Sequence, residues 1–197
     1  MPRSIATRTG DDGTTGLLYG RRLAKDHPRI EAVGALDELN VALGAAKAMA
    51  APGPARVFAA AVQSSLIALM GELSCAPADA ARYARSQFAK VAAADLQRLD
   101  EAVAALECRG LDLAGWAAPG ANLRAVAWDQ ARVTARRAER RLAGLSRRGG
   151  AVRPLLLRYL NRLSDVLWLL AREAEAAPGR RRAGPNPQLK RPRRAVR

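Results

Sequence analysis

The chain has 197 residues, enough for one domain with a hydrophobic core of its own. Hydrophobic residues make up 49% of it and aromatic residues only 4%, which favours closely packed helices and argues against a β-rich fold. The formal net charge is +15, but eight Lys and Arg fall in residues 178–197, where no acid offsets them, so +7 is left for the rest. This uneven distribution weakens the case for a nucleic-acid-binding protein.

The N-terminus, Met-Pro-Arg-Ser, lacks the apolar core of a signal peptide, and apolar stretches elsewhere are interrupted by charge. We therefore expect neither export nor a membrane span, and a cytoplasmic location. Cys75 and Cys108 are expected to be reduced thiols. Since two cysteines without CxxC spacing and a single histidine form no ligand pattern, no protein-held metal site is predicted.

Residues 1–29 are expected to form a loop segment, because Gly, Thr and Asp cluster at 7–16 with Arg21, Arg22 and Lys25 soon after. Glycine lets the backbone approach an anion, and successive N–H groups can form a nest for phosphate. The segment matches neither GxxxxGK[ST] nor GxGxxG. From these residues alone, a phosphate-binding loop and an ordinary polar turn both remain open.

Three helices are predicted next, at 30–50, 55–75 and 90–109, from apolar residues spaced three and four apart. The buried positions expected in the first are Val33, Leu36, Leu43 and Ala46, with Asp37, Asn40 and Lys47 on another face. Those expected in the second and third are Phe58, Val62, Leu66, Leu69, Leu73, Leu96, Leu99, Val103 and Leu106.

A loop at 110–120 contains Trp116, and Asn122 is a suitable N-cap for a helix at 122–143. This helix packs five arginines and one glutamate into residues 132–141. The helical period places Arg132, Arg136, Glu139 and Arg140 on one side, and turns Val133, Ala138 and Leu142 toward a core. Guanidinium groups in register suit phosphate or carboxylate oxygens, but a solvated basic stripe is the alternative.

After a turn at 146–150, the last helix, 154–176, has a regular seam of alternating spacings of four and three: Leu156, Leu160, Leu163, Leu167, Leu170 and Ala174. Asn161 and Asp165 lie off this seam, one turn apart. Asparagine gains little inside a helix unless its amide is used, either by a neighbouring helix or by a ligand.

These elements predict an all-α fold, a five-helix up-and-down bundle over residues 30–177. The N-terminal segment 1–29 precedes it, and the Pro- and Arg-rich residues 178–197 are expected to be a basic, disordered tail.

Taken jointly, five blocks resemble the PduO-type ATP:cob(I)alamin adenosyltransferases, and they occur in the order of that family. They are Thr-Arg-Thr-Gly-Asp-Asp-Gly-Thr-Thr (7–15), Gly-Ala-Leu-Asp-Glu-Leu-Asn (34–40), Trp-Ala-Ala-Pro-Gly (116–120), Arg-Val-Thr-Ala-Arg-Arg-Ala-Glu-Arg (132–140) and Tyr-Leu-Asn-Arg-Leu-Ser-Asp (159–165). No single block is specific, but the joint match is.

The resemblance implies a ferritin-like, cobalamin adenosyltransferase-like bundle that forms a homotrimer with active sites between subunits. It implies transfer of the 5′-deoxyadenosyl group of ATP to cob(I)alamin, with Mg²⁺ bound mainly through the ATP phosphates. The implied partners are a reductase that supplies Co(I) and an adenosylcobalamin-dependent acceptor enzyme. No membrane partner is implied.

By resemblance, the catalytic residues are Asp37, Trp116, Arg132 and Arg136, with an ion pair between Asp37 and Arg132 near the corrin. The ATP-binding residues are Thr7, Arg8, Thr9, Gly10, Gly13, Thr14, Thr15, Lys25, Arg136, Arg137, Glu139, Arg140 and Asn161.

Four positions of this sequence depart from the family pattern. Trp116 replaces the usual Phe, a wedge that displaces the lower axial ligand of cobalt. Arg8 replaces Lys, Asp129 stands where His is usual, and Ala135 replaces a frequent Cys. Trp116 and Asp129 leave open a non-catalytic cobalamin- or nucleotide-binding protein of this fold as an alternative function. The high net charge and the basic tail leave open a second and weaker one, a basic helical nucleic-acid binder.

Overall fold

The computed structural model describes residues 6–111, 113 and 117–176, most of them in helices. The α-helices of this part of the chain are α1 (Pro28–Met49), α2 (Pro54–Leu73), α3 (Ala80–Ala84), α4 (Ala93–Glu107), α5 (Leu123–Arg147) and α6 (Pro154–Ala176). They are preceded by strands β1 (Thr14–Gly16) and β2 (Arg22–Ala24), and single 3-10 turns lie at η1 (Leu18–Gly20) and η2 (Pro77–Asp79). Trp116 and the predicted tail at 178–197 lie outside the described residues.

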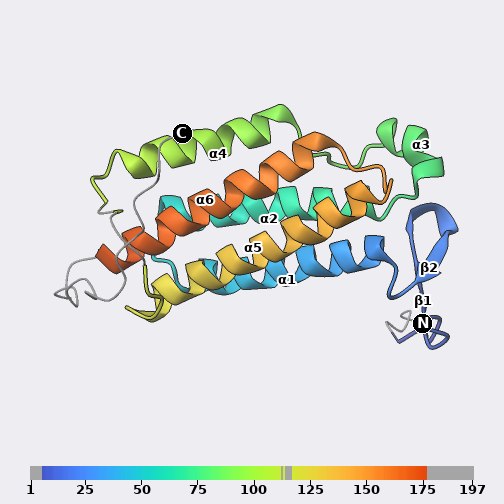
Figure 1. The fold of residues 1–197 in the computed structure, drawn as a ribbon, viewed down its shortest axis with the longest axis horizontal. Coiled ribbons are helices and arrows are strands. Elements are labelled where there is room, and N and C mark those ends of the chain that lie inside the picture. Colours follow the sequence, from blue (N-terminus) through green and yellow to red (C-terminus); the bar gives the residue numbers. More distant parts are fainter. Residues whose placement is uncertain (1–5, 112, 114–116, 177–197) are drawn as a thin grey trace, which may run out of the picture.

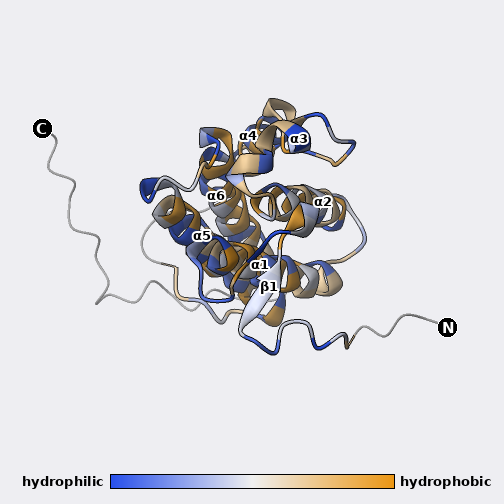
Figure 2. Cartoon of the chain, turned by 90° about the vertical axis from the view of Figure 1, so that its right-hand side faces the viewer, coloured by the Kyte–Doolittle hydropathy of each residue, from blue (hydrophilic) through white to orange (hydrophobic). Residues whose placement is uncertain are grey.

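The long helices lie side by side along one direction (Figure 1). α1 packs against α2 and α5, and α6 packs against α5 and α4. Seen from the end that carries the strands, the apolar sides of these helices are turned toward one another (Figure 2). The architecture is therefore a bundle held together by the apolar stripes of its long helices.

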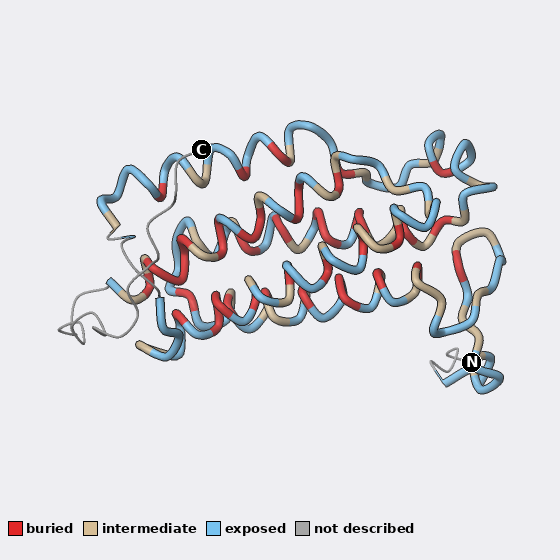
Figure 3. The backbone as a smooth tube through the Cα atoms, in the orientation of Figure 1, coloured by how far each residue is buried: buried red, intermediate tan, exposed pale blue. Residues whose placement is uncertain are grey.

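The core follows the predicted seams closely, and buried positions recur along the inner sides of the helices (Figure 3). All six seam positions of α6 are buried, as are Leu36, Leu43 and Ala46 of α1. Four expectations are wrong in detail. Val33, Phe58 and Val103 are only partly buried, and Val133 is 43% exposed because it lies in a groove between α1 and α5.

The predicted five-helix count and the purely helical class need correction. The short helix α3 adds one turn to the five long helices. β1 and β2 form an antiparallel pair with Thr14 opposite Ala24, so the segment predicted as a loop contains a β-hairpin. The hairpin and α3 lie at the same end of the bundle (Figure 1).

The helix ends explain where the elements begin. His27 Nδ1 accepts a hydrogen bond from Arg29 N at 3.0 Å, and Pro28 occupies the first position of α1. Asn122 Oδ1 accepts from Ala125 N at 2.9 Å, which confirms the predicted N-cap of α5. At the α5–α6 turn a Cβ on Gly150 would lie 2.4 Å from Leu145 Cδ1, so only glycine fits this approach.

Among the described helices, α2 is long and apolar enough to cross a membrane by length and composition alone. Core helices of soluble proteins pass the same test. Here Val62, Leu66, Leu69 and Leu73 of α2 are buried in the bundle.

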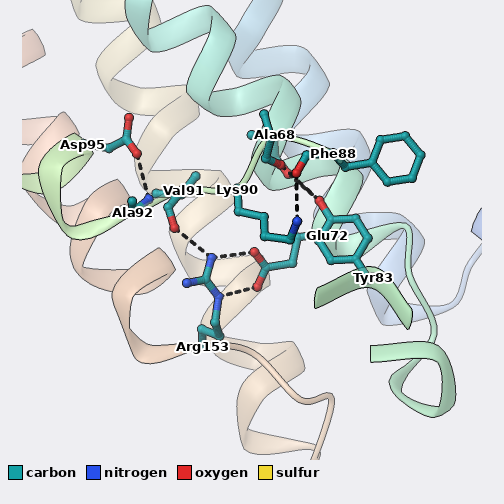
Figure 4. Close-up of polar contacts among 10 residues, drawn as sticks. Ala68, Glu72, Tyr83, Phe88, Lys90, Val91, Ala92, Asp95 and Arg153 are labelled. Carbon is teal, nitrogen blue, oxygen red and sulfur yellow. Dashed lines mark hydrogen bonds and ion pairs between the residues drawn. The ribbon is translucent and has the colours of Figure 1, made fainter. Parts of the chain in front are cut away.

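A polar cluster fixes the connection between α2 and α4 (Figure 4). Arg153 donates from Nε and Nη2 to both carboxylate oxygens of Glu72, at 2.7 and 2.6 Å, and Nη2 also donates to Val91 O at 2.9 Å. Nearby, the buried Tyr83 donates its hydroxyl to the carbonyl oxygens of Ala68 and Ala89 at 3.5 and 3.3 Å. α2, α3 and the start of α6 are thereby tied together.

We expect Arg153→Met to lower the free energy of unfolding by about 1 to 2 kcal/mol, because a bidentate charged pair is lost at a partly exposed site. Urea denaturation followed by circular dichroism measures this. Arg158→Met is the control, since Arg158 is exposed on α6 and forms no ion pair with a described residue. Equal stability of the two variants would contradict the role assigned to the Glu72 pair.

Candidate functional site

The glycine- and threonine-rich loop before β1 is a compact turn. Gly13 N donates to Gly10 O at 3.2 Å, and Gly13 has φ 79°, a conformation that favours glycine. Asp12 Oδ1 accepts from the backbone N and the hydroxyl of Thr14, at 2.9 and 2.8 Å. These bonds, first that from the Thr14 N–H, lower the pKa of Asp12.

Two cations lie against this loop. Arg22 donates to Thr14 Oγ1 from Nε and Nη2, at 2.9 and 2.6 Å, and its Nη2 also donates to Thr9 O. Lys25 bonds its backbone N to Gly13 O at 2.9 Å, and its ammonium lies over Gly10, 3.3 Å from where a Cβ would be. The loop thus joins exposed backbone, hydroxyls and cationic side chains in one place.

The arginine run of α5 divides between two surroundings. Arg137 forms an ion pair with Glu38, and Arg141 lies 3.5 Å from Glu31, both across the α1–α5 contact. Within this chain, Arg136 and Arg140 are exposed and form no ion pair with a described residue. These two guanidiniums are therefore available to an anion.

A groove of about 600 Å³ runs between α1 and α5. Its walls combine acidic, basic and apolar side chains: Asp37, Glu38, Val41, Ala42, Gln130, Val133, Thr134, Arg137 and Arg140. Val41 is 68% exposed, so the groove presents an apolar strip beside its charges.

The Asp37–Arg132 ion pair suggested by resemblance is not formed within the chain. Arg132 donates from Nε to Asp129 Oδ1 at 2.8 Å, and the other oxygen of Asp129 accepts from Arg172 Nη2 at 2.5 Å. Asp129 and Arg172 are both 5% exposed, whereas Asp37 lies in the groove wall and pairs with no described residue. The partner of Arg132 within the described part of the chain is a carboxylate one turn away on the same helix.

Glu139 and Asn161 meet across the α5–α6 contact. Asn161 Nδ2 donates to Glu139 Oε1 at 3.2 Å. The asparagine amide therefore has a partner on a neighbouring helix, the first of the two roles open to it, and Glu139 lies on the same helix as Arg136 and Arg140.

The described part of the chain does not bring the loop onto the arginine helix. No hydrogen bond or ion pair joins residues 7–13 to any α5 side chain among the described residues. Figure 1 shows the hairpin beyond the end of α1, whereas the arginine run lies along α5. The described part of the chain thus contains the two halves of the candidate site separately.

A second, largely apolar pocket of about 380 Å³ lies where α4 ends and α5 begins. Phe58 and Trp128 belong to its walls, and Arg109 forms an ion pair with Glu173 there. Trp116, the predicted wedge, falls in the connection between α4 and α5, so its own position is outside the described residues.

Two residues that matter for the geometry were not among the predicted site residues. Arg22 organises the loop, and its place in a basic cluster was the only signal. Arg172 could not be recognised as a buried residue, since nothing in the sequence marks which charged residue of α6 points inward. Among the described residues, no cluster of three His, Cys, Asp or Glu side chains is placed to hold a metal ion.

The fold and these groups define a helical-bundle protein with a candidate anion-binding site, because a glycine-rich loop and exposed arginines both suit phosphate oxygens. More specifically, the chain belongs to the cobalamin adenosyltransferase family, whose family model matches residues 5–174.

The chain is similar to curated relatives and to solved structures. It is 41% identical over 176 residues to the corrinoid adenosyltransferase PduO of Salmonella typhimurium, covering 88% of this chain and 50% of that one. With a corrinoid adenosyltransferase of Citrobacter freundii it shares 35% identity over 88% of this chain and 96% of that one. The chain thus spans about half the length of the PduO relatives but nearly all of the shorter one.

Among solved structures, the chain superposes with a TM-score of 0.79 and 28% identity on a variant PduO-type ATP:corrinoid adenosyltransferase from Lactobacillus reuteri complexed with cobalamin and ATP. The match covers 87% of this chain and 93% of that one. Fold and family are therefore established together.

Proposed function

We propose that the protein transfers the 5′-deoxyadenosyl group of ATP to cob(I)alamin, giving adenosylcobalamin and triphosphate. The electron pair of Co(I) forms the new Co–C5′ bond, and the C5′–O bond of ATP breaks with its pair leaving on the triphosphate. The observation that carries the proposal is the conjunction, in a chain of this family, of the Gly/Thr loop with Arg136 and Arg140, which form no ion pair with a described residue.

The protein's task on the ATP side is to hold and neutralise the triphosphate. Backbone N–H groups and hydroxyls of residues 7–15, with Lys25, would wrap it, while Arg136 and Arg140 add guanidinium forks. Arg137 reaches the site only if it leaves Glu38, and Asn161 acts through Glu139 by holding its carboxylate. Mg²⁺ would bind mainly through phosphate oxygens, since it needs few protein ligands.

We infer that a second subunit completes the site, with the loop of one subunit lying against the arginine helix of another in a homotrimer. The separation of the two halves within the chain supports this arrangement, as does the exposed apolar strip of the α1–α5 groove at Val41 and Val133. Residues 1–29 would then act as the ATP-binding segment and residues 30–177 as the adenosyltransferase bundle, with 178–197 as an accessory basic tail.

The corrinoid side is assigned to Asp37, Arg132 and Trp116. Arg132 uses only Nε toward Asp129, so its two Nη atoms are free of hydrogen bonds to described residues and can meet Asp37 of a neighbouring subunit. Trp116 would exclude the lower axial ligand with its apolar ring. A cytoplasmic location, a reductase that supplies Co(I) and an adenosylcobalamin-dependent acceptor complete the proposal.

The charges of the folded part favour this function over nucleic-acid binding. Arginines that would form a basic stripe on α5 are partly neutralised by α1, through the pairs of Arg137 with Glu38 and Arg141 with Glu31. A backbone-binding surface would instead leave its cations free for phosphates.

The test is to mix the full chain with ATP, Mg²⁺ and chemically reduced cobalamin without oxygen, and to follow the light-sensitive spectrum of adenosylcobalamin. We expect product in proportion to ATP consumed, with triphosphate released. No product with ATP still bound would favour a non-catalytic nucleotide-binding protein. No binding of ATP or corrinoid would overturn the proposal altogether.

A further inference from the structure

Among the described residues, the loop of residues 7–13 is connected to the bundle through the hairpin. Its hydrogen bonds run within the loop or to the hairpin residues Thr14, Arg22 and Lys25, and none joins it to a helix among the described residues. Whatever fixes the hairpin on the bundle therefore fixes the direction in which the loop points.

The hairpin is docked at its tip, on the segment that follows α2. Leu18 N donates to Ser74 O at 2.8 Å, and Leu17 is buried. Arg21 Nε forms an ion pair with Asp79 Oδ2 in η2. The guanidinium carbon of Arg82 in α3 lies 4.0 Å from the ring centroid of Tyr19. Three different contacts thus converge on five residues of the tip.

The docking holds the tip in a conformation that it would not adopt freely. Tyr19 has φ 64°, in the left-handed region that is costly for a residue with a Cβ. The ring stays there with Arg82 stacked on it, which indicates that the surroundings, rather than local preference, decide the geometry.

The platform under the tip is itself rigidly attached. The buried Arg29 at the start of α1 donates from Nη1 to Leu73 O and Cys75 O, at 3.1 and 3.3 Å, and from Nη2 to Gly150 O. Burial lowers the pKa of this guanidinium. Tyr83, adjacent to Arg82, is buried and bonded to two backbone carbonyls. The backbone that carries Asp79 and Arg82 is thus held on its N-terminal side by Arg29 and on its C-terminal side by Tyr83.

We propose that Asp79 and Arg82 are positioning residues for ATP, which act through Arg21 and Tyr19 to orient the phosphate loop. This inference rests on the proposed function. We call the contacts of Asp79 with Arg21 and of Arg82 with Tyr19 the latch. The three-residue strands of the hairpin, about 10 Å long, separate the latch from the loop, so neither Asp79 nor Arg82 touches the nucleotide. Releasing the tip would leave the hydrogen bonds within the loop intact but would let the loop change its direction. The binding free energy of ATP would then be reduced by the entropic cost of ordering the loop.

The experiment compares Asp79→Asn, Arg82→Gln and the double variant with the wild-type protein. We expect the ATP Kd, measured by calorimetry, to rise about two- to fivefold in each single variant and about tenfold in the double variant. The KM for reduced cobalamin should stay within about twofold, because the latch acts only on the nucleotide loop. Tryptic cleavage after Arg22 and Lys25 should accelerate, a readout that needs no ligand.

Rescue variants separate positioning from general damage. The charge exchange Arg21→Asp with Asp79→Arg should restore ATP affinity toward the wild-type value, and Arg82→Lys should keep most of it. Arg98→Gln, which breaks a comparable exposed pair with Asp95 on α4, is the matched control and should change none of these values.

Unchanged ATP affinity in the double variant, or an equal loss toward ATP and cobalamin, would overturn the latch. The proposed function fails separately, if the wild-type protein itself neither binds ATP nor forms adenosylcobalamin. Because the Kd for ATP and the proteolysis rate do not depend on turnover, the two failures can be told apart.

Discussion

Replacing Arg136 or Arg140 with alanine is expected to lower kcat for adenosyl transfer by about two to three orders of magnitude. The leaving triphosphate gains negative charge as the C5′–O bond breaks, and a preorganised cationic donor lost at such a group typically costs this much. Both side chains are exposed and neither has an acidic partner among the described residues, so each can meet a phosphate without breaking an existing pair. Anaerobic turnover with saturating ATP and reduced cobalamin measures the effect.

The same variants should remain folded, since alanine favours a helix and neither arginine contributes to the core. Thermal unfolding within a few degrees of the wild type checks this. Arg147→Ala, on the last turn of the same helix, is the control and should keep nearly full activity. Normal turnover in both active-site variants would remove these residues from the proposed triphosphate site.

The long helices were predictable because each buries one side. In α6 the four–three spacing of leucines leaves one rotation of the helix that hides them all, and that is the rotation observed. The cap at Asn122 and the turn before Pro154 follow local rules of the same kind. Local periodicity and capping therefore carry most of the fold.

The hairpin and α3 escaped prediction because they are too short to show a period. β1 and β2 have three residues each, and their pairing depends on a tip docked against Ser74, which is distant in sequence. α3 has a single turn and is stabilised largely by burying Tyr83. Such elements form through tertiary contacts, which no window of sequence reveals.

The candidate site was predicted as a set of residues but not as a set of partners. The helical period correctly places the arginines on the outer sides of α5, yet it cannot tell which of them an acid will neutralise. Glu31 and Glu38 reach Arg141 and Arg137 because α1 and α5 run antiparallel, so increasing numbers on one helix meet decreasing numbers on the other. Arg136 and Arg140, which have no acidic partner among the described residues, lie between these pairs and α6.

Asp129→Ala is expected to destabilise the protein by about 3 kcal/mol, because one partner of a buried charged pair is removed. The Asp129 carboxylate is buried between two guanidiniums, and without it the buried Arg172 keeps only its ion pair with Glu175, at 3.1 Å, among the described residues. Arg172 is the more affected partner, because it is buried and loses its hydrogen bond from Nη2 to Asp129. Arg132 is partly exposed and can turn to water. Urea denaturation at neutral pH measures the loss.

A double-mutant cycle tests the cause. Arg172→Met should cost less than Asp129→Ala, because Asp129 keeps its bond to Arg132, and the double variant Asp129→Leu with Arg172→Met should lose much less than the sum of the two. Arg109→Gln, which breaks the more exposed pair with Glu173, is the matched control and should cost at most about 1 kcal/mol. Additive losses would show that the two charges do not depend on each other. In that case the buried Asp129–Arg172 ion pair would contribute nothing specific to the stability of the bundle. The replacement of the family's usual His by Asp129 would then matter only for how Arg132 is presented at the surface.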